Sequence, residues 1–117
     1  FRDEYPIAFI AIGDNSLRKK YAALLREYHF LIPSIVSPAA NISPGAVLGD
    51  GVVILPMARV GEASIGDFSI IASNGVVSSG ARVGSFSHID CGAIVQQRAH
   101  VKESTWVRSG EIYGDKL

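Results

Sequence analysis

Histidine is the side chain best suited to move a proton at neutral pH, and the 117-residue sequence contains three histidines, His29, His88 and His100. His88 directly precedes the aliphatic residue Ile89, and Trp106 follows it eighteen positions later. We keep two interpretations of His88, a ligand contact in a groove or a surface histidine stacked on an aromatic ring. His100 could supply a base for an altered site, although its position favours a solvent-facing side chain. His29 is expected near a helix end, where its charge is favourable.

Metal and thiol chemistry have less support in the sequence. His88 and His100 are twelve positions apart, which does not match a histidine-based zinc site, so we expect no metal. Cys91 is the single cysteine and no histidine neighbours it in the repeat described below, so a free surface thiol is the favoured interpretation over a nucleophile. A lone cysteine is also compatible with a reducing, cytoplasmic setting.

The elements that must position these residues follow from a repeat of six. An aliphatic residue recurs at every sixth position, with one step of five, at Val36, Ile42, Leu48, Ile54, Val60, Ile65, Ile71, Val77, Val83, Ile89, Val95, Val101 and Val107. The fourth residue after each aliphatic is small in nearly every repeat, for example Ala40, Ala58, Ser64, Ser69, Gly75, Ser87 and Ala93. A period of six fits neither an α-helix nor an alternating strand.

Three such hexads form a triangular coil of 18 residues, and successive coils stack at about 4.8 Å through backbone hydrogen bonds. The sequence therefore predicts an all-β fold, a left-handed parallel β-helix over residues 34–117, with the aliphatic residues inside. An ordinary β-sandwich would show two-residue alternation with variable turns instead. The five-residue step between Val60 and Ile65 should tighten one corner without breaking the stack.

Stacking also predicts which residues lie above one another. Trp106 should lie next to His88, Cys91 between Ser73 and Ser109, and Gln97 in one column with Ser79 and Glu62. Glycine, asparagine and aspartate are expected at the corners, where a positive φ is inexpensive for them, at Gly45, 49–51, Gly61, 66–67, 74–75 and Gly84.

Residues 1–33 are expected to be a short strand–helix–strand remnant of an N-terminal α/β unit. The apolar segment 7–12 predicts a strand, and Asp14, Asn15 or Ser16 can cap a helix that ends near His29. Leu17, Tyr21, Leu24, Leu25 and Tyr28 recur at helical spacing, and basic residues occupy the other face. Residues 30–32 predict a second strand that Pro33 ends.

The bulk composition excludes some partners. Eleven basic and eleven acidic residues cancel without a charge block, so we expect no nucleic-acid or anionic-membrane binding. No apolar segment approaches the roughly 20 residues that span a bilayer. Because the first residue is Phe1 and residues 1–33 form only part of an α/β unit, we expect the chain to be a partial product of a longer protein.

Several segments resemble the NeuD/PglD-type sugar acetyltransferases. They are Ile10-Ala11-Ile12-Gly13-Asp14-Asn15 with Arg18-Lys19-Lys20, the entry into the repeat at residues 32–40, Ile65-Gly66-Asp67, residues 84–89 with Gly92-Ala93, and Trp106. The resemblance implies a homotrimer, acetyl-CoA as cosubstrate, and an amino or hydroxyl group of a nucleotide sugar or sialic acid as acceptor. It also implies sites between adjacent β-helices, where a histidine is the general base and a glycine amide stabilises the oxyanion.

The sequence departs from this family at the catalytic positions. The position of the family's base is Ser79, and a serine hydroxyl does not accept a proton at neutral pH. Gln97 and Arg98 stand where the family has the glycines of its oxyanion hole. His88 is the retained second histidine, and we take His88, Gln97, Arg98 and Trp106 as candidate acetyl-CoA contacts.

These observations leave three hypotheses. The first is a CoA-dependent sugar O- or N-acetyltransferase of impaired activity that uses His88 and an unidentified base. The second is a non-catalytic, trimeric β-helix scaffold or binding module. The third is a fragment of a longer enzyme.

Overall fold

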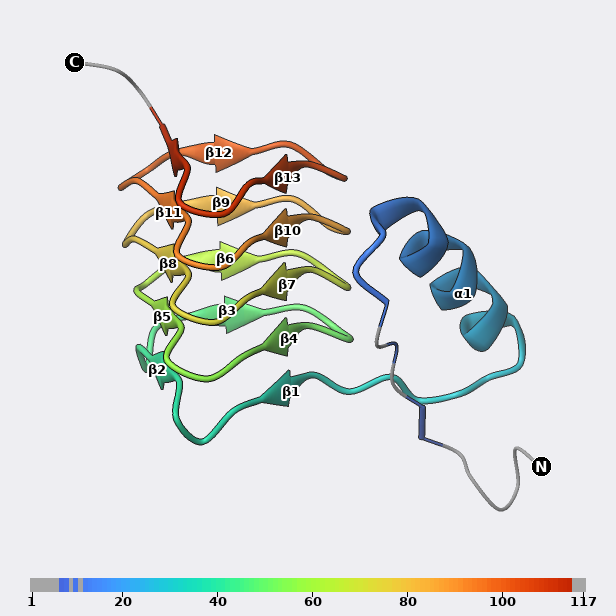
Figure 1. Ribbon diagram of the computed structural model, residues 1–117. Coiled ribbons are helices and arrows are strands. Elements are labelled where there is room, and N and C mark those ends of the chain that lie inside the picture. Colours follow the sequence, from blue (N-terminus) through green and yellow to red (C-terminus); the bar gives the residue numbers. More distant parts are fainter. Residues whose placement is uncertain (1–6, 9, 11, 115–117) are drawn as a thin grey trace.

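Two-residue strands alternate with turns from residue 35 to residue 113 of the computed structural model, which describes residues 7–8, 10 and 12–114. The strands form three parallel sheets that enclose a prism (Figure 1). The first sheet contains β1 (Ile35–Val36), β4 (Val53–Ile54), β7 (Ile70–Ile71), β10 (His88–Ile89) and β13 (Trp106–Val107). The second contains β2 (Asn41–Ile42), β5 (Arg59–Val60), β8 (Val76–Val77), β11 (Ile94–Val95) and β14 (Ile112–Tyr113). The third contains β3 (Val47–Leu48), β6 (Ser64–Ile65), β9 (Arg82–Val83) and β12 (His100–Val101). The prediction of a left-handed parallel β-helix is confirmed.

The register of the sheets follows the repeat. His88 pairs with Ile70 on one side and with Trp106 on the other, each 18 positions away in the sequence. Val53 pairs with Ile70, only 17 positions away, because the five-residue step lies between them. The stack therefore continues across the short step, as the sequence predicts.

The short step is absorbed at the corner between β5 and β6. The amide of Ala63 donates to the carbonyl of Gly61 at 2.8 Å, whereas the matching corner one coil later closes with a longer turn, from Ala81 to Ser78. Ser64 pairs with Arg82 in the third sheet, so Ala63 occupies the small interior position. The assignment of that position to Ser64 is therefore wrong, because the shortened turn moves the register by one residue.

The interior of the prism is a continuous column of aliphatic side chains. Ile54, Ile71, Ile89 and Val107 stack in the first sheet with at most 1% of their surface exposed. Burial of one such side chain stabilises the fold by about 2 kcal/mol. The outward-facing neighbour in each strand, such as His88 beside Ile89, is thereby fixed in position.

The conformation of the corners is predicted only in part. Gly51 and Asn74 have positive φ, as expected. Gly49, Gly66 and Gly84 do not; they are needed because the next coil passes so close that a Cβ would lie 2.5–2.9 Å from a backbone nitrogen. Two further positive φ values belong to phenylalanines, at Phe68 and Phe86, in two of the turns that face the helix.

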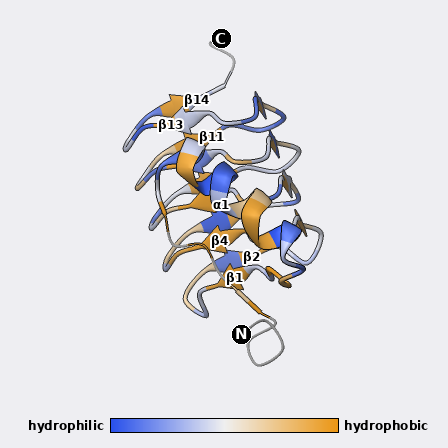
Figure 2. Cartoon of the chain, turned by 90° about the vertical axis from the view of Figure 1, so that its right-hand side faces the viewer, coloured by the Kyte–Doolittle hydropathy of each residue, from blue (hydrophilic) through white to orange (hydrophobic). Residues whose placement is uncertain are grey.

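The helix α1 (Asn15–Glu27) begins after Asp14, whose side chain accepts a hydrogen bond from the amide of Leu17 at 2.9 Å. It lies beside the turns that join the third sheet to the first (Figure 1). Its buried residues are Arg18 and Ala22. Of the apolar series, Leu17, Tyr21 and Leu24 instead stay exposed, at 46%, 40% and 43%, whereas Leu25 is partly buried against the β-helix. Figure 2 shows hydrophilic and hydrophobic segments alternating along α1.

Among the described residues of the two expected strands beside α1, one parallel bridge joins Ile7 and Leu31, with a hydrogen bond from the amide of Ala8 to the carbonyl of Leu31 at 2.8 Å. Phe9 and Ala11 of the predicted strand 7–12 lie outside the described residues. Ile10, Ala22, Ile32 and Phe68 form a small apolar cluster between α1 and the β-helix. The division into residues 1–33 and 34–117 stays a prediction.

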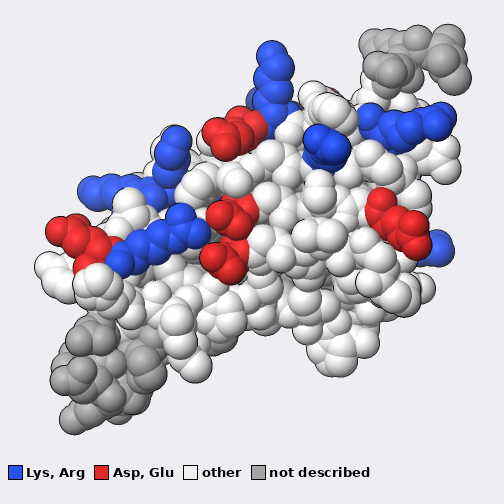
Figure 3. All heavy atoms as spheres, turned by 180° about the vertical axis from the view of Figure 1, so that it is seen from behind, with Lys and Arg blue, Asp and Glu red and all other residues white. Residues whose placement is uncertain are grey.

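The surface is mixed in charge. On the face seen from behind, Lys and Arg are interspersed with Asp and Glu (Figure 3). Within the described part of the chain, no helix has the length and apolar character that crossing a bilayer requires.

Candidate functional site

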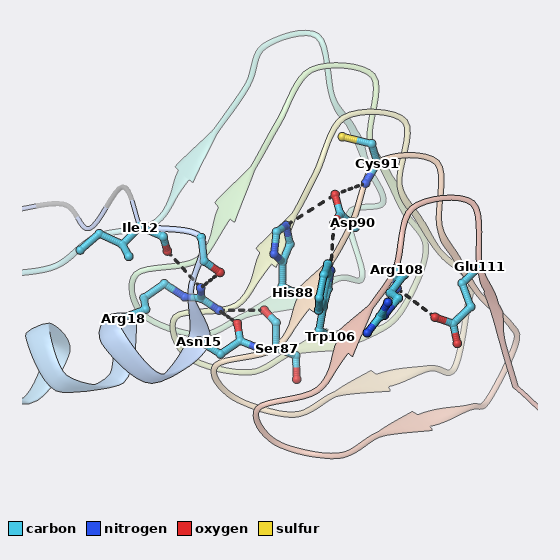
Figure 4. A network of polar contacts seen from close by, with 11 residues as sticks. Ile12, Asn15, Arg18, Ser87, His88, Asp90, Cys91, Trp106, Arg108 and Glu111 are labelled. Carbon is cyan, nitrogen blue, oxygen red and sulfur yellow. Dashed lines mark hydrogen bonds and ion pairs between the residues drawn. The ribbon is translucent and has the colours of Figure 1, made fainter.

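The outward face of β10 carries a histidine–aspartate pair. Nε2 of His88 lies 3.9 Å from Oδ1 of Asp90, and about one fifth of each side chain is exposed. Ile89 lies between them in the sequence, and its side chain is fully buried in the interior of the prism. Because side chains alternate along a strand, His88 and Asp90 both point outward on the same face. Figure 4 shows the two side chains facing each other, with a dashed line between the imidazole and the carboxylate.

Asp90 is held from two further directions. Its Oδ2 accepts a hydrogen bond from Nε1 of Trp106 at 2.9 Å, and its Oδ1 accepts one from the amide of Cys91 at 2.7 Å (Figure 4). The hydrogen bond from Trp106, followed by that from Cys91, lowers the pKa of Asp90 below its ordinary value. The carboxylate is therefore ionised at neutral pH and fixed in orientation.

The surroundings of His88 favour its neutral form. Burial is the largest influence and lowers the pKa of the imidazole, and the nearby Arg18 guanidinium lowers it further. Asp90 and a hydrogen bond to the backbone of Gly13 act in the opposite direction. A neutral imidazole beside an ionised carboxylate is an arrangement that can accept a proton.

His88 of this pair lines a cleft of about 510 Å³ between the β-helix and the start of α1. One side consists of His88, Ser104 and Trp106, and the other of residues 13–16. The guanidinium of Arg108 lies over the Trp106 ring, 4.6 Å from its centroid. The cleft thus combines an aromatic surface, a proton acceptor and the N-terminal turn of a helix.

Arg18 fixes the α1 side of the cleft. Its side chain is 1% exposed and donates five hydrogen bonds, which is the full capacity of a guanidinium. Two of them reach carbonyls of the β-helix, Phe68 at 2.6 Å and Ser87 at 3.2 Å. The others hold the loop before α1, including the carbonyl of Gly13 at 3.1 Å. The wall that faces His88 is therefore tied to the β-helix.

Ser79 belongs to a different part of the surface. It lines an open groove of about 430 Å³ on the second sheet together with Arg59 and Gln97. The amide of Arg98 donates to the Ser79 carbonyl at 3.3 Å, and Arg98 has a φ of 60°. Ser79 and Gln97 are therefore stacked at one corner, as the register predicts, and Arg98 lies beside them. His88 and Trp106, the other two candidate acetyl-CoA contacts, lie on the first sheet.

Glu62 does not supply the base that Ser79 lacks. The amide of Glu62 stacks beneath Ser79 and points to its hydroxyl oxygen at 3.3 Å, so the predicted column exists. The Glu62 carboxylate instead extends over Gly45, where a Cβ would lie 3.0 Å from Oε1. The shortened corner turns this side chain toward the third sheet and away from the Ser79 groove.

The remaining candidates are separate from both places. His100 is exposed on the third sheet, and His29 is an exposed residue of positive φ two positions beyond α1. Cys91 has an exposed free thiol, and its backbone carbonyl accepts a hydrogen bond from the amide of Gly110 in the next coil. Among residues 7–8, 10 and 12–114, no three His, Cys, Asp or Glu side chains are grouped as a metal site requires.

Sequence reasoning did not find Asp90 or Arg18. Asp90 was detectable, because residues two apart on a strand share a face and His88-Ile89-Asp90 therefore presents two polar groups together. Arg18 carried no such signal, because arginine at a helical position is normally exposed to solvent.

Solved structures with the same fold were found, although no family model matches the sequence. Two variants of perosamine N-acetyltransferase from Caulobacter crescentus, each in complex with CoA and GDP-perosamine, have TM-scores of 0.74 and 0.71 at 26% and 25% identity. The match covers 93% of this chain and 61% of theirs. The chain is structurally similar to the sugar N-acetyltransferases. A further structure of this kind, the acetyltransferase domain of PglB from Neisseria gonorrhoeae with acetyl coenzyme A, has a TM-score of 0.67 at 22% identity over 89% of this chain and 60% of that domain. The chain thus spans about three fifths of the length of these sugar N-acetyltransferases.

Proposed function

We propose that the chain is a sugar acetyltransferase-like protein that takes acetyl-CoA as cosubstrate and an amino sugar or nucleotide sugar as acceptor, with impaired activity. The observation that carries this proposal is the similarity, over 93% of the chain, to an enzyme whose structures hold both CoA and a nucleotide-linked amino sugar. We place the reaction in the cytoplasm, in keeping with the exposed free thiol of Cys91.

The impairment follows from the Ser79 corner. The serine hydroxyl does not take a proton at neutral pH, and the carboxylate of Glu62 is directed elsewhere. General-base catalysis contributes roughly 100- to 10,000-fold to a rate, so a site without its base should be slower by that factor. Gln97 adds a side chain where the resemblance implies a glycine.

We further propose that the chain acts as a homotrimer. The outward residues of the second sheet become apolar toward its upper end, at Val76, Ile94 and Ile112, and Ile112 is 61% exposed. Packing a second copy against this column would remove it from water. Adjacent copies could then bring Gln97 and Arg98 of one chain toward His88 and Trp106 of the next as contacts for the donor. Light scattering at micromolar concentration tests this, and a monomer mass would refute it.

A non-catalytic scaffold or binding module is the second candidate. It is favoured by the Ser79 groove, which contains an arginine, an asparagine and serines but none of the carboxylates or imidazoles that accept protons. In that case acetyl-CoA or a nucleotide sugar would bind without turnover.

Calorimetry and a transfer assay separate the two candidates. Isothermal titration should detect micromolar acetyl-CoA binding, and mass spectrometry should detect slow acetylation of GDP-perosamine, used as a probe acceptor. Binding without any product would favour the binding module, and no heat with either compound would refute both ligand assignments. The double variant Ser79→His with Gln97→Gly should raise the rate if those two positions cause the impairment. An unchanged rate would assign the impairment to another part of the protein.

A further inference from the structure

We infer that His88 has taken over the proton-accepting role that Ser79 cannot fill, with Asp90 as its positioning residue. This inference rests on the proposed acetyl transfer and names the group that carries out what transfer remains. It differs from an interpretation of His88 as a simple ligand contact, because it requires the imidazole to change protonation during the reaction.

The geometry of the pair supports a base with an oriented partner. Asp90 cannot swing away, because Trp106 and the amide of Cys91 hold one carboxylate oxygen each, at 2.9 and 2.7 Å. Its Oδ1 lies 3.9 Å from Nε2 of His88, too far for a hydrogen bond but near enough to stabilise an imidazolium. The imidazole also forms a hydrogen bond to the backbone of Gly13, which orients the ring in the resting state.

The charged groups around His88 come from three elements. Asp90 comes directly after β10, Arg18 and Asp14 approach from α1 and its cap, and Arg108, which comes directly after β13, lies over the Trp106 ring. Asp90 is the opposing charge with the largest influence on His88, and Arg18 partly offsets it. Because burial lowers the pKa of His88, the imidazole is mainly neutral at pH 7 and ready to accept a proton.

The cleft gives an acceptor access to His88. Its volume of about 510 Å³ is within the usual range for a small-molecule site. The Trp106 ring offers a flat apolar surface, and residues 13–16 offer polar groups on the opposite wall. An amine carried on a sugar ring is a ligand with both kinds of surface.

The chemical step balances with acetyl-CoA as the only co-reactant. The amine nitrogen of the acceptor forms a bond to the acetyl carbonyl carbon, and its proton passes to the imidazole of His88. The carbon–sulfur bond then breaks, and the CoA thiolate leaves with that proton, which restores neutral His88. Asp90 stabilises the imidazolium between these events and does not itself exchange a proton.

Three variants test this with the whole chain, acetyl-CoA and GDP-perosamine as the probe acceptor. His88→Asn should lower kcat about 100-fold and abolish the acidic limb of the pH–rate profile. Asp90→Asn should keep the limb but move it to lower pH, because the charge that raises the pKa of His88 is lost, and should leave the KM for acetyl-CoA nearly unchanged. Trp106→Phe should act in the same direction as Asp90→Asn, with a smaller change.

His100→Asn is the matched control, because His100 holds the same outward strand position on the third sheet, away from the cleft. It should retain the wild-type rate and pH profile. Wild-type turnover in His88→Asn with an unchanged acidic limb would overturn this inference and leave the proposed acetyl transfer intact. A wild-type chain no faster than the uncatalysed reaction would overturn both. Circular dichroism of each variant separates a lost base from a lost fold.

Discussion

Replacement of Arg18 by methionine should release α1 from the β-helix without unfolding the β-helix itself. Methionine keeps much of the length of the side chain but none of its donors. The two hydrogen bonds that cross to the β-helix, at the carbonyls of Phe68 and Ser87, are lost. Both carbonyls then remain in a buried region, where each loses its charged donor.

The magnitude follows from these two contacts. A hydrogen bond from a charged group contributes about 1.5–3 kcal/mol, so the loss of two should weaken docking by about 3–6 kcal/mol. A change of 1.4 kcal/mol is about tenfold in an equilibrium constant, so the equilibrium constant for docking should fall by a factor of at least about 100.

Hydrogen exchange measures this directly. Amides of α1 should lose protection by at least about 100-fold in Arg18→Met, and those of interior residues such as Ile71 and Ile89 should keep theirs. Lys19→Met is the matched control. Lys19 is exposed, and its ammonium group lies over the Phe86 ring at 5.8 Å from the ring centroid, which is a weak contact compared with the hydrogen bonds of Arg18. Equal protection of α1 in the two variants would refute the assignment of Arg18 as the anchor.

Three further outcomes follow from the packing and the charges. Gly66→Ala should destabilise the fold far more than Gly92→Ala in urea denaturation, because a Cβ at Gly66 would lie 2.5 Å from the Ser85 amide nitrogen, whereas at Gly92 nothing lies within 4 Å and only the positive φ is strained. Ile89→Ala should lower the free energy of unfolding by about 2–5 kcal/mol in the same assay, because it leaves a cavity in the interior column. The unfolding free energy should also fall in two steps as the pH is lowered. The contribution of neutral His88 is lost from the ordinary pKa of histidine, about 6.5, down to the lowered pKa of His88, and the contribution of ionised Asp90 is lost from the ordinary pKa of aspartate, about 3.9, down to the lowered pKa of Asp90. Asp90→Asn should remove the most acidic part of that fall, and an unchanged pH dependence in this variant would contradict the assigned role of the carboxylate.

The repeat was predictable because the fold requires an aliphatic residue facing the interior at each sixth position, and the sequence has one at each of these positions apart from the single five-residue step. The five-residue step was equally visible in the sequence. The residue predicted for the small interior position was wrong by one, Ser64 instead of Ala63, because the corner closes with a short hydrogen bond from the amide of Ala63 to the carbonyl of Gly61. The glycines were predicted from backbone conformation, although Gly66 and Gly84 are required for the close passage of the next coil. That distinction depends on three-dimensional spacing, which the sequence does not express.

The helix shows a different limit. Its apolar periodicity predicted a face containing Leu17 and Tyr21, yet Arg18 and Ala22 are buried. The orientation of α1 is set by the carbonyls of Phe68 and Ser87, which accept hydrogen bonds from the Arg18 guanidinium. Both carbonyls are far from Arg18 in the sequence. The hydrophobic pattern alone therefore does not predict that one buried, hydrogen-bonded arginine decides which face of α1 packs on the β-helix.

The candidate site was predicted in pieces. The stacking of Trp106 on His88 followed from the register, and so did the grouping of Ser79 with Gln97. The cleft did not, because it depends on how the loop before α1 is tied to the β-helix. Asp90 became significant only once its hydrogen bond from Trp106 was known.

Fluorescence of Trp106 tests the central claim, that the cleft beside His88 holds the ligands of acetyl transfer, because this is the single tryptophan of the chain and it lines that cleft. Titration with acetyl-CoA and then with GDP-perosamine should give a saturable change in emission, with a midpoint in the micromolar range for acetyl-CoA. Emission that stays constant to millimolar concentrations of both compounds would contradict the account.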